Sequence, residues 1–313
     1  MFFLSFVAGL ALLLGGAELL VRGGGRIALA LRVPIIVVAL TIVAFGTSMP
    51  EISVSVTAAV KGSGDMALGN VIGSNIANIA LVLGAATVIM PIHVGRELMR
   101  REVPTLVLMQ VSLPLMLLDG LLGRVDGLIL LVMGLVYTLV LLRDALAGRA
   151  SPDTDEVEEG GDYLTNIALL VLGVALLLAG GQFFVDGASG IARALGLDER
   201  VIGLTVVALG TSAPELVTGT MAAYRGENDM AVGNSLGSNI LNVALALAVS
   251  AMVQPIPLHQ SGTWVDLGVA FLVTVLLIPM ILRGRVISRV EGGLLITLYV
   301  VYVVGLGAFG GGS

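Results

Sequence analysis

Two six-residue motifs, GTSMPE at 46–51 and GTSAPE at 210–215, each place a glutamate beside a proline inside apolar sequence. A charged carboxyl at the centre of a bilayer costs about 2.5–3.5 kcal/mol on insertion scales. Because every Lys and Arg lies in or beside a predicted loop, Glu51 and Glu215 have no basic partner within the spans. A bound cation is the natural counter-charge. Two carboxylates form a hard, all-oxygen site that suits Ca²⁺ or Na⁺ and not zinc or copper. The alternative is a pair of protonated glutamates that hydrogen-bond the helices together.

The prolines suggest how the backbone contributes to this site. Pro50 and Pro214 lack an N–H and clash with the carbonyl four residues earlier, so we expect each helix to break there. Irregular backbone at membrane depth is tolerated where it lines a cavity. The residues expected to present freed carbonyls are Ala44, Thr47, Ala208 and Thr211. The hydroxyls of Thr47, Ser48, Thr211 and Ser212 are either ion ligands or groups that fix the fold.

A second polar motif follows each glutamate: GNVIGSNIAN at 69–78 and GNSLGSNILN at 233–242. Asn70, Ser74 and Asn78 are spaced four residues apart and therefore share one helix face. Their counterparts in the second motif are Asn234, Ser238 and Asn242. This stripe either lines the site or forms interhelical hydrogen bonds, and its pairing with the glutamate helices in both copies favours the site. Asn75 and Asn239 fall off the stripe and are interpreted as structural.

The two sets of motifs belong to an internal repeat. With an offset of 164 residues, twenty-two of forty positions are identical between 40–79 and 204–243. Chance does not produce such a match, and it predicts two structurally equivalent halves. The expected organisation is a first repeat at 1–143, an acidic linker at 144–162 and a second repeat at 163–313. The linker is either a calcium-binding regulator or, as we favour, a solvated connection, since it lacks the regular spacing of a calcium loop.

The elements that carry these motifs are predicted to be membrane spans. The chain of 313 residues is 57% hydrophobic and only 12% charged, with a mean hydropathy of +1.04. We predict an all-α polytopic membrane protein of ten transmembrane helices. They are expected near 3–21, 34–60, 66–90, 102–119, 125–143, 163–185, 198–224, 230–253, 264–282 and 287–308.

The distribution of basic residues predicts the orientation. Twelve Lys and Arg fall on one side of the predicted spans and four on the other, and cytoplasmic loops carry the excess. Both termini are therefore expected outside and the 144–162 linker inside. Because each half has five spans, the halves are inverted copies, an arrangement that transporters use for alternating access. A duplicated bundle that serves packing alone explains the repeat but not the retention of its costly polar residues.

The paired motifs resemble the alpha repeats of the cation/calcium exchanger superfamily, and specifically of the sodium/calcium exchangers. The resemblance covers the whole chain and implies electrogenic Na⁺/Ca²⁺ antiport by alternating access, with the first and sixth helices sliding past the core. It implies a calcium site made by Glu51, Glu215 and the backbone carbonyls of Thr47 and Thr211. It implies flanking sodium sites that use Ala44, Ser48, Ser74, Ala208, Ser212 and Ser238.

One departure from the family pattern concerns ion selectivity. Some relatives, including potassium-dependent ones, carry an aspartate where this chain has Asn242. With asparagine at both 78 and 242, the site has two carboxylates, and we expect transport without K⁺.

Other functions remain as alternatives. Exchange of H⁺ for Ca²⁺ is the alternative within transport, and a cation channel is a less favoured class. An enzyme is not expected, because no nucleophile–base pair is present and the only histidines, His93 and His259, lie near span ends. We expect no cofactor and no nucleic-acid partner. The expected form is a monomer in the plasma (inner) membrane, with the lipid bilayer and the two ions as its partners.

Overall fold

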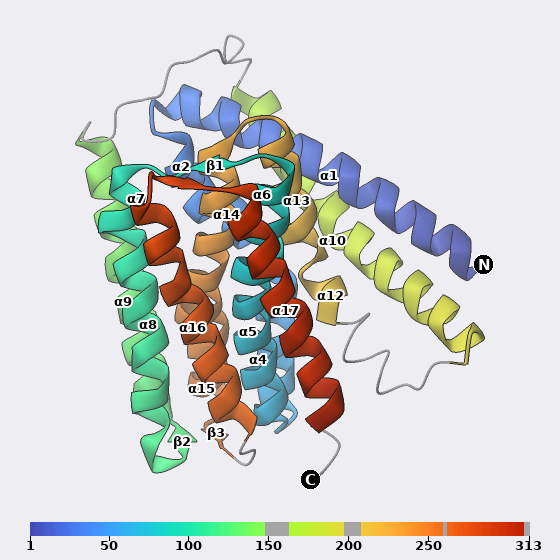
Figure 1. The fold of residues 1–313 in the computed structure, drawn as a ribbon, viewed down its shortest axis with the longest axis vertical. Coiled ribbons are helices and arrows are strands. Elements are labelled where there is room, and N and C mark those ends of the chain that lie inside the picture. Colours follow the sequence, from blue (N-terminus) through green and yellow to red (C-terminus); the bar gives the residue numbers. More distant parts are fainter. Residues whose placement is uncertain (148–162, 197–207, 259–261, 310–313) are drawn as a thin grey trace.

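The computed structural model describes residues 1–147, 163–196, 208–258 and 262–309, and almost all of them are helical (Figure 1). Within this part of the chain, eight helices are long and apolar enough to cross a membrane, and one bent pair also qualifies as a single span. The eight are Phe2–Leu31, Gly64–Ile89, Leu98–Asp119, Arg124–Leu146, Tyr163–Ala194, Asn228–Val253, Gly262–Leu282 and Arg289–Leu306. The all-α membrane fold is confirmed. The expected span at 198–224 is described only from Ala208 onward.

The first half contains α1 (Phe2–Leu31), α2 (Ile35–Val38), the π-helical η1 (Ala39–Val43), α3 (Ala44–Thr47), α4 (Met49–Val60), α5 (Gly64–Ala77), the π-helical η2 (Asn78–Leu83), α6 (Gly84–Ile89), β1 (Ile92–His93), α7 (Arg96–Arg100), α8 (Glu102–Met116), the 3-10 helix η3 (Leu117–Asp119), β2 (Leu121–Leu122) and α9 (Arg124–Leu146). The second half contains α10 (Tyr163–Ala194), α12 (Ala208–Thr211), α13 (Ala213–Tyr224), α14 (Asn228–Leu241), the π-helical η5 (Asn242–Leu247), α15 (Ala248–Val253), β3 (Ile256–Pro257), α16 (Gly262–Leu282), β4 (Val286–Ile287) and α17 (Arg289–Phe309). From α4 to α6 and from α13 to α15 the bounds differ by the repeat offset of 164 residues.

The break expected at each proline lies two residues earlier, at a serine. Ser48 has φ −83° and ψ 5°, and the two parts of its span are bent by 49°. Ser212, with φ −88° and ψ 7°, is its equivalent. Pro50 and Pro214 are the second residues of α4 and α13, where a missing N–H costs no intrahelical bond. The proline therefore starts a new helix rather than interrupting an existing one.

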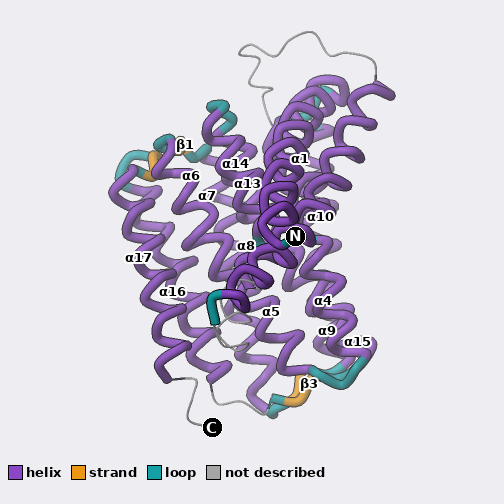
Figure 2. The backbone as a smooth tube through the Cα atoms, turned by 90° about the vertical axis from the view of Figure 1, so that its right-hand side faces the viewer, coloured by secondary structure: helices purple, strands orange, loops and turns teal. Residues whose placement is uncertain are grey.

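Two long helices, α1 and α10, lie side by side against one side of the bundle (Figures 1 and 2). Their backbones approach closely through glycine: a Cβ added at Gly16 would lie 2.8 Å from the Gly173 carbonyl oxygen. Both helices run about nine residues beyond the predicted ends. Arg22 and Arg26, which were expected in a loop, are therefore inside α1. The correction follows from helix continuity, since an arginine near a span end does not stop a helix.

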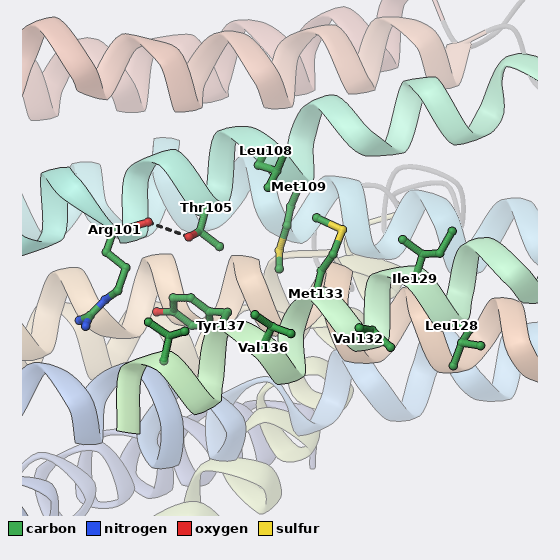
Figure 3. Close-up of a pocket in the computed structure, with 11 residues that line it drawn as sticks. Arg101, Thr105, Leu108, Met109, Leu128, Ile129, Val132, Met133, Val136 and Tyr137 are labelled. Atoms are coloured by element: carbon green, nitrogen blue, oxygen red, sulfur yellow. Dashed lines mark hydrogen bonds between the residues drawn. The ribbon is translucent and has the colours of Figure 1, made fainter. Parts of the chain in front are cut away.

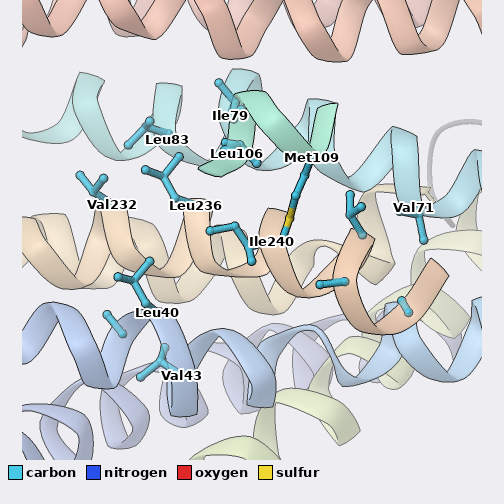
Figure 4. Close-up of a cluster of buried hydrophobic side chains, with 14 of the residues drawn as sticks. Leu40, Val43, Val71, Ile79, Leu83, Leu106, Met109, Val232, Leu236 and Ile240 are labelled. Atoms are coloured by element: carbon cyan, nitrogen blue, oxygen red, sulfur yellow. The ribbon is translucent and has the colours of Figure 1, made fainter. Parts of the chain in front are cut away.

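The core is built around α14, which is buried on nearly all sides. Figure 4 shows Leu236 and Ile240 of this helix between Leu40 of η1 and Leu83 of η2. The approach to η1 depends on small residues, because a Cβ at Gly237 would lie 2.8 Å from the Leu40 Cα. The glycines of the second Gly-Asn motif thus allow a close approach to a neighbouring helix. In the first half the equivalent neighbours of α5 fall in 203–208, largely outside the described residues.

Two short antiparallel ribbons join the halves at opposite ends of the bundle (Figure 1). β1 pairs with β4, with Ile92 opposite Ile287. β2 pairs with β3, with Leu122 opposite Ile256. Each ribbon connects a loop of one half to a loop of the other, so both ends of the bundle have fixed cross-connections.

Candidate cation-binding site

Both glutamates are 0% exposed and lie in the first turns of α4 and α13. The serine at each helix break reaches the glutamate of the opposite half. Ser48 Oγ donates to Glu215 Oε1 at 3.1 Å, and Ser212 Oγ donates to Glu51 Oε1 at 3.4 Å. These crossed hydrogen bonds bring the two motifs, 164 residues apart in sequence, together inside the bundle. Each glutamate is the third residue of its helix, and negative charge is favoured in the first turn of a helix.

Hydroxyls from the Gly-Asn helices reach the same region. Ser74 Oγ donates to Glu51 Oε1 at 3.4 Å. Thr47 Oγ1 lies 3.1 Å from Asn234 Oδ1 and 3.4 Å from Ser238 Oγ. Thr211, in α12, is part-buried. The structure therefore brings Thr47, Ser48, Ser74, Ser212 and Ser238 together near the two glutamates.

Asn70 and Asn234 have a role that their position on the polar stripe did not specify. Their side-chain amides donate to the backbone carbonyls of Glu51 and Glu215, each at 3.2 Å. Asn70 also donates to Ser55 Oγ at 2.8 Å. They anchor the glutamate backbone, which fixes where each carboxylate points. The sequence signal for this role is the retention of both asparagines in the repeat.

Asn78 and Asn242 begin the π-helical segments η2 and η5. π-Helical turns inside α-helices occur frequently at functional sites. Asn242 Nδ2 donates to Asn75 Oδ1 at 3.1 Å. Asn75 and Asn239 exchange hydrogen bonds from each side-chain amide to the other's backbone carbonyl, at 3.4 and 3.0 Å. These two residues are repeat equivalents and join the halves, which agrees with their predicted structural role.

Four acceptor oxygens of the site are buried without a hydrogen-bond partner in the described structure. They are Glu51 Oε2, Glu215 Oε2, Asn78 Oδ1 and Asn242 Oδ1. Buried polar atoms are nearly always paired, because an unpaired one keeps its desolvation cost. These four orphan oxygens are the same two atoms from each half, while Asn239 Oδ1 and the donor Asn78 Nδ2 are also buried without a partner among the described residues. Among the ion pairs between described residues, none includes either glutamate.

The alanines give a different result from the prediction. The expectation that the proline frees the Ala44 carbonyl is wrong, because Ser48 N–H donates to that carbonyl at 3.0 Å. Pro50 is the second residue of α4, so its missing N–H does not affect the Ala44 carbonyl, and Ser48 continues the helical pattern up to the break. For Ala208 the structure describes the backbone in α12, and its side chain lies outside the described residues.

Thr218 was missed by the sequence analysis. It is fully buried in α13 and its hydroxyl has no hydrogen-bond partner among the described residues. The repeat places Val54 at the equivalent position, so comparison of the halves gave no signal there.

A groove of about 530 Å³ lies elsewhere, between α8 and α9 (Figure 3). It is apolar along most of its length, with Met109, Val132 and Val136 among its lining residues and Arg101 and Tyr137 towards one end. None of the candidate site residues lines it. The groove is part of the outer apolar surface and not of the cation site.

Two inverted halves that meet at a buried pair of carboxylates are typical of secondary transporters. The model of the sodium/calcium exchanger protein family matches residues 1–143 and 165–307. Putative antiporter CaxA of Alkalimonas amylolytica is 39% identical over 95% of both chains. Sodium/calcium exchanger MaX1 of Methanosarcina acetivorans is 29% identical over 96% of this chain and 97% of that protein.

Among solved structures, the sodium-calcium exchanger NCX_Mj soaked with 2.5 mM Na⁺ and 0.1 mM Ca²⁺ superposes with a TM-score of 0.84. It is 33% identical, and the match covers 96% of this chain and 97% of that one. This chain belongs to the sodium/calcium exchanger family. It is an integral membrane antiporter and not an enzyme.

Proposed function

We propose that this protein exchanges Na⁺ for Ca²⁺ across the plasma (inner) membrane by alternating access, as a monomer with both termini outside. The four orphan oxygens, two from each half, are the observation that carries the proposal. Cations bound in this region neutralise the buried carboxylates and give unpaired acceptor oxygens a partner. MaX1 and NCX_Mj are both called sodium/calcium exchangers, which supports the same two ions.

Calcium is held by Glu51 and Glu215, with the backbone carbonyls of Thr47 and Thr211. Its two charges balance two carboxylates, and carboxylate and carbonyl oxygens are its preferred ligands. Sodium occupies flanking positions with fewer charged ligands. These positions use Ser48 and Ser74 on one side and Ala208, Ser212 and Ser238 on the other. The hydrogen bonds from Ser48, Ser212 and Ser74 to the carboxylates support this placement, because each hydroxyl already lies beside a glutamate.

The ion balance makes transport electrogenic and independent of K⁺. Asn78 and Asn242 contribute neutral oxygens that do not titrate. Two carboxylates balance one Ca²⁺, whereas several Na⁺ ions overshoot them, so exchange moves net charge. The site has no third carboxylate that could balance the charge of a further monovalent ion such as K⁺.

The test is uptake of ⁴⁵Ca²⁺ into proteoliposomes under an imposed Na⁺, K⁺ or H⁺ gradient. We expect uptake with the Na⁺ gradient, in K⁺-free buffer and with a protonophore present, and stimulation by a membrane potential of the appropriate sign. Uptake that collapses with the protonophore indicates H⁺ exchange, and a strict K⁺ requirement contradicts the role given to the asparagines. Flux without any counter-ion indicates a channel.

A further inference from the structure

A second pocket, more polar than the groove between α8 and α9, has a volume of about 460 Å³ and lies at the end of the bundle where β1 meets β4. Three arginines line it: Arg96 and Arg100 of α7, and Arg285, which follows α16. Its apolar lining includes Val94, Met99 and Leu282. None of the residues proposed to bind Ca²⁺ or Na⁺ takes part, so this pocket is separate from the cation site.

The fold assembles this pocket from both halves. β1 and β4 pair His93 with Val286, and Val94 N–H donates to the Arg285 carbonyl at 2.8 Å. These bonds hold the α16–α17 connection against the start of α7. Arg285 has φ 57°, a left-handed conformation that residues other than glycine and asparagine adopt rarely. The ribbon thus fixes an arginine of the second half next to two arginines of the first.

The three arginines have no carboxylate partner within the described residues. Arg101, Arg22 and Arg225, by contrast, form ion pairs with glutamates. All three pocket arginines are exposed, and no described acidic side chain lines the pocket. Three like charges around one concave surface repel one another until an anion neutralises them. Guanidinium groups match phosphate oxygens with paired hydrogen bonds.

The surroundings favour a lipid over a soluble anion. The pocket follows the last residues of a membrane span, and Leu282 at its edge is 69% exposed. A free phosphate leaves this apolar rim uncovered, whereas the glycerol and acyl region of a phospholipid covers it. Loops with the arginine excess are the ones expected on the cytoplasmic side, and basic pockets between helices on that side bind anionic headgroups.

We propose that Arg96, Arg100 and Arg285 form a binding site for the phosphate of an anionic phospholipid in the cytoplasmic leaflet. The lipid joins α7 of the first half to the α16–α17 connection of the second. This inference does not depend on which ions the protein exchanges.

The experiment is native mass spectrometry of the detergent-solubilised protein titrated with dioleoylphosphatidylglycerol, and in parallel with dioleoylphosphatidylcholine. The test variant is Arg96→Gln/Arg285→Asn, in which asparagine tolerates the left-handed backbone. The control variant, Arg143→Gln/Arg283→Gln, removes the same charge from exposed positions outside the pocket. Melting temperatures of all three proteins without added lipid confirm that they are folded.

We expect the wild type to prefer phosphatidylglycerol, the test variant to bind it about tenfold more weakly, and the control variant to match the wild type. Equal loss in both variants means that net charge alone attracts the lipid and overturns the site. Unchanged binding of phosphatidylglycerol by the test variant also overturns the proposed site. A third titration adds inorganic phosphate. If phosphate displaces the lipid at similar concentrations, the pocket binds a soluble anion and the lipid proposal fails.

Discussion

At the scale of single residues, each carboxylate receives a hydrogen bond from the half of the chain that does not carry it. Ser48 belongs to the first repeat and bonds Glu215, while Ser212 belongs to the second and bonds Glu51. The site is therefore one unit with two contributing halves and not two sites side by side. A substitution in either half is therefore expected to affect both carboxylates.

The first prediction concerns the glutamates. Glu51→Gln and Glu215→Gln are each expected to abolish calcium exchange, because an amide removes half the charge of the site and keeps its size. The measurement is ⁴⁵Ca²⁺ uptake under a Na⁺ gradient, with size-exclusion profiles to confirm folding. Glu227→Gln, a loop glutamate, is the matched control. Substantial exchange by both site variants contradicts the two-carboxylate site.

The second prediction distinguishes the ligands of Na⁺ from those of Ca²⁺. Ser74→Ala and Ser238→Ala are expected to weaken Na⁺ activation several-fold more than Ca²⁺ affinity. Each hydroxyl is one neutral oxygen among the few that hold Na⁺, whereas the carboxylates dominate Ca²⁺ binding. Ser250→Ala is the control, since Ser250 is equally buried but bonds the Ala246 carbonyl of its own helix. Equal losses for both ions mean that the serines only join helices.

Sequence comparison between the halves identified most of the residues that the structure gathers. It worked because both halves contribute the same atoms, so a polar residue needed twice was retained twice. It failed at Thr218, which only one half possesses. It also failed at the Ala44 carbonyl, because residue identity does not reveal which backbone group loses its donor at a proline.

At the scale of elements, the contact between α1 and α10 is made by backbone rather than by long side chains. A Cβ at Gly16 would lie 2.8 Å from the Gly173 carbonyl oxygen, and one at Gly180 would lie 2.7 Å from the Leu13 nitrogen. From this close fit we expect the two helices to move as one body if the protein works by alternating access.

The third prediction tests this contact with two neighbouring glycines. Gly16→Ala is expected to lower stability by about 1–3 kcal/mol, because the added methyl overlaps a backbone that cannot yield. Gly15→Ala is expected to be neutral or stabilising, since nothing lies within 4 Å of its added Cβ and alanine favours the helix. Thermal melting in detergent measures both. A similar melting temperature for the two variants contradicts the tight packing of α1 on α10.

Apolar run length predicted the existence and type of the elements well, and their ends less well. α1 continues to Leu31 although Arg22 suggested a loop, since the arginine is held by Glu18 one turn away. The break near Pro50 was expected. It lies at Ser48 because proline is accepted in the first turn of a helix, so that α4 begins before Pro50, at Met49. The pairing of β1 with β4 left no sequence signal, because two residues are too few to show a pattern.

At the scale of the whole molecule, inversion predicts opposite membrane sides for equivalent residues. Lys61 and Arg225 directly follow α4 and α13, and both are exposed. This chain has no cysteine, so Lys61→Cys and Arg225→Cys each introduce a single thiol. In right-side-out vesicles we expect an impermeant maleimide to label residue 61 and not residue 225. Labelling of both from outside contradicts the predicted orientation.

The last prediction follows from an ion pair that ties α1 to the bundle. Arg225 Nε donates to Glu18 Oε2 at 2.8 Å, which fastens α1 to the turn after α13. The repeat equivalents of Glu18, Arg22 and Arg225 are Gln182, Asp186 and Lys61. In this structure Gln182 Nε2 donates to Asp186 at 3.1 Å. If the halves exchange conformations during transport, Lys61 pairs with Asp186 in the other state while the Arg225–Glu18 pair opens.

Two cysteine pairs test this exchange of ion pairs: Glu18→Cys/Arg225→Cys and Lys61→Cys/Asp186→Cys. We expect each pair to form a disulfide under mild oxidation and to stop ⁴⁵Ca²⁺ transport until a reductant is added. Formation of the second disulfide requires the state that breaks the Glu18–Arg225 contact, so it is expected to fall when the first pair is already closed in a four-cysteine variant. Simultaneous closure of both pairs in one molecule contradicts the exchange, because inverted halves that swap conformations hold only one of these contacts at a time.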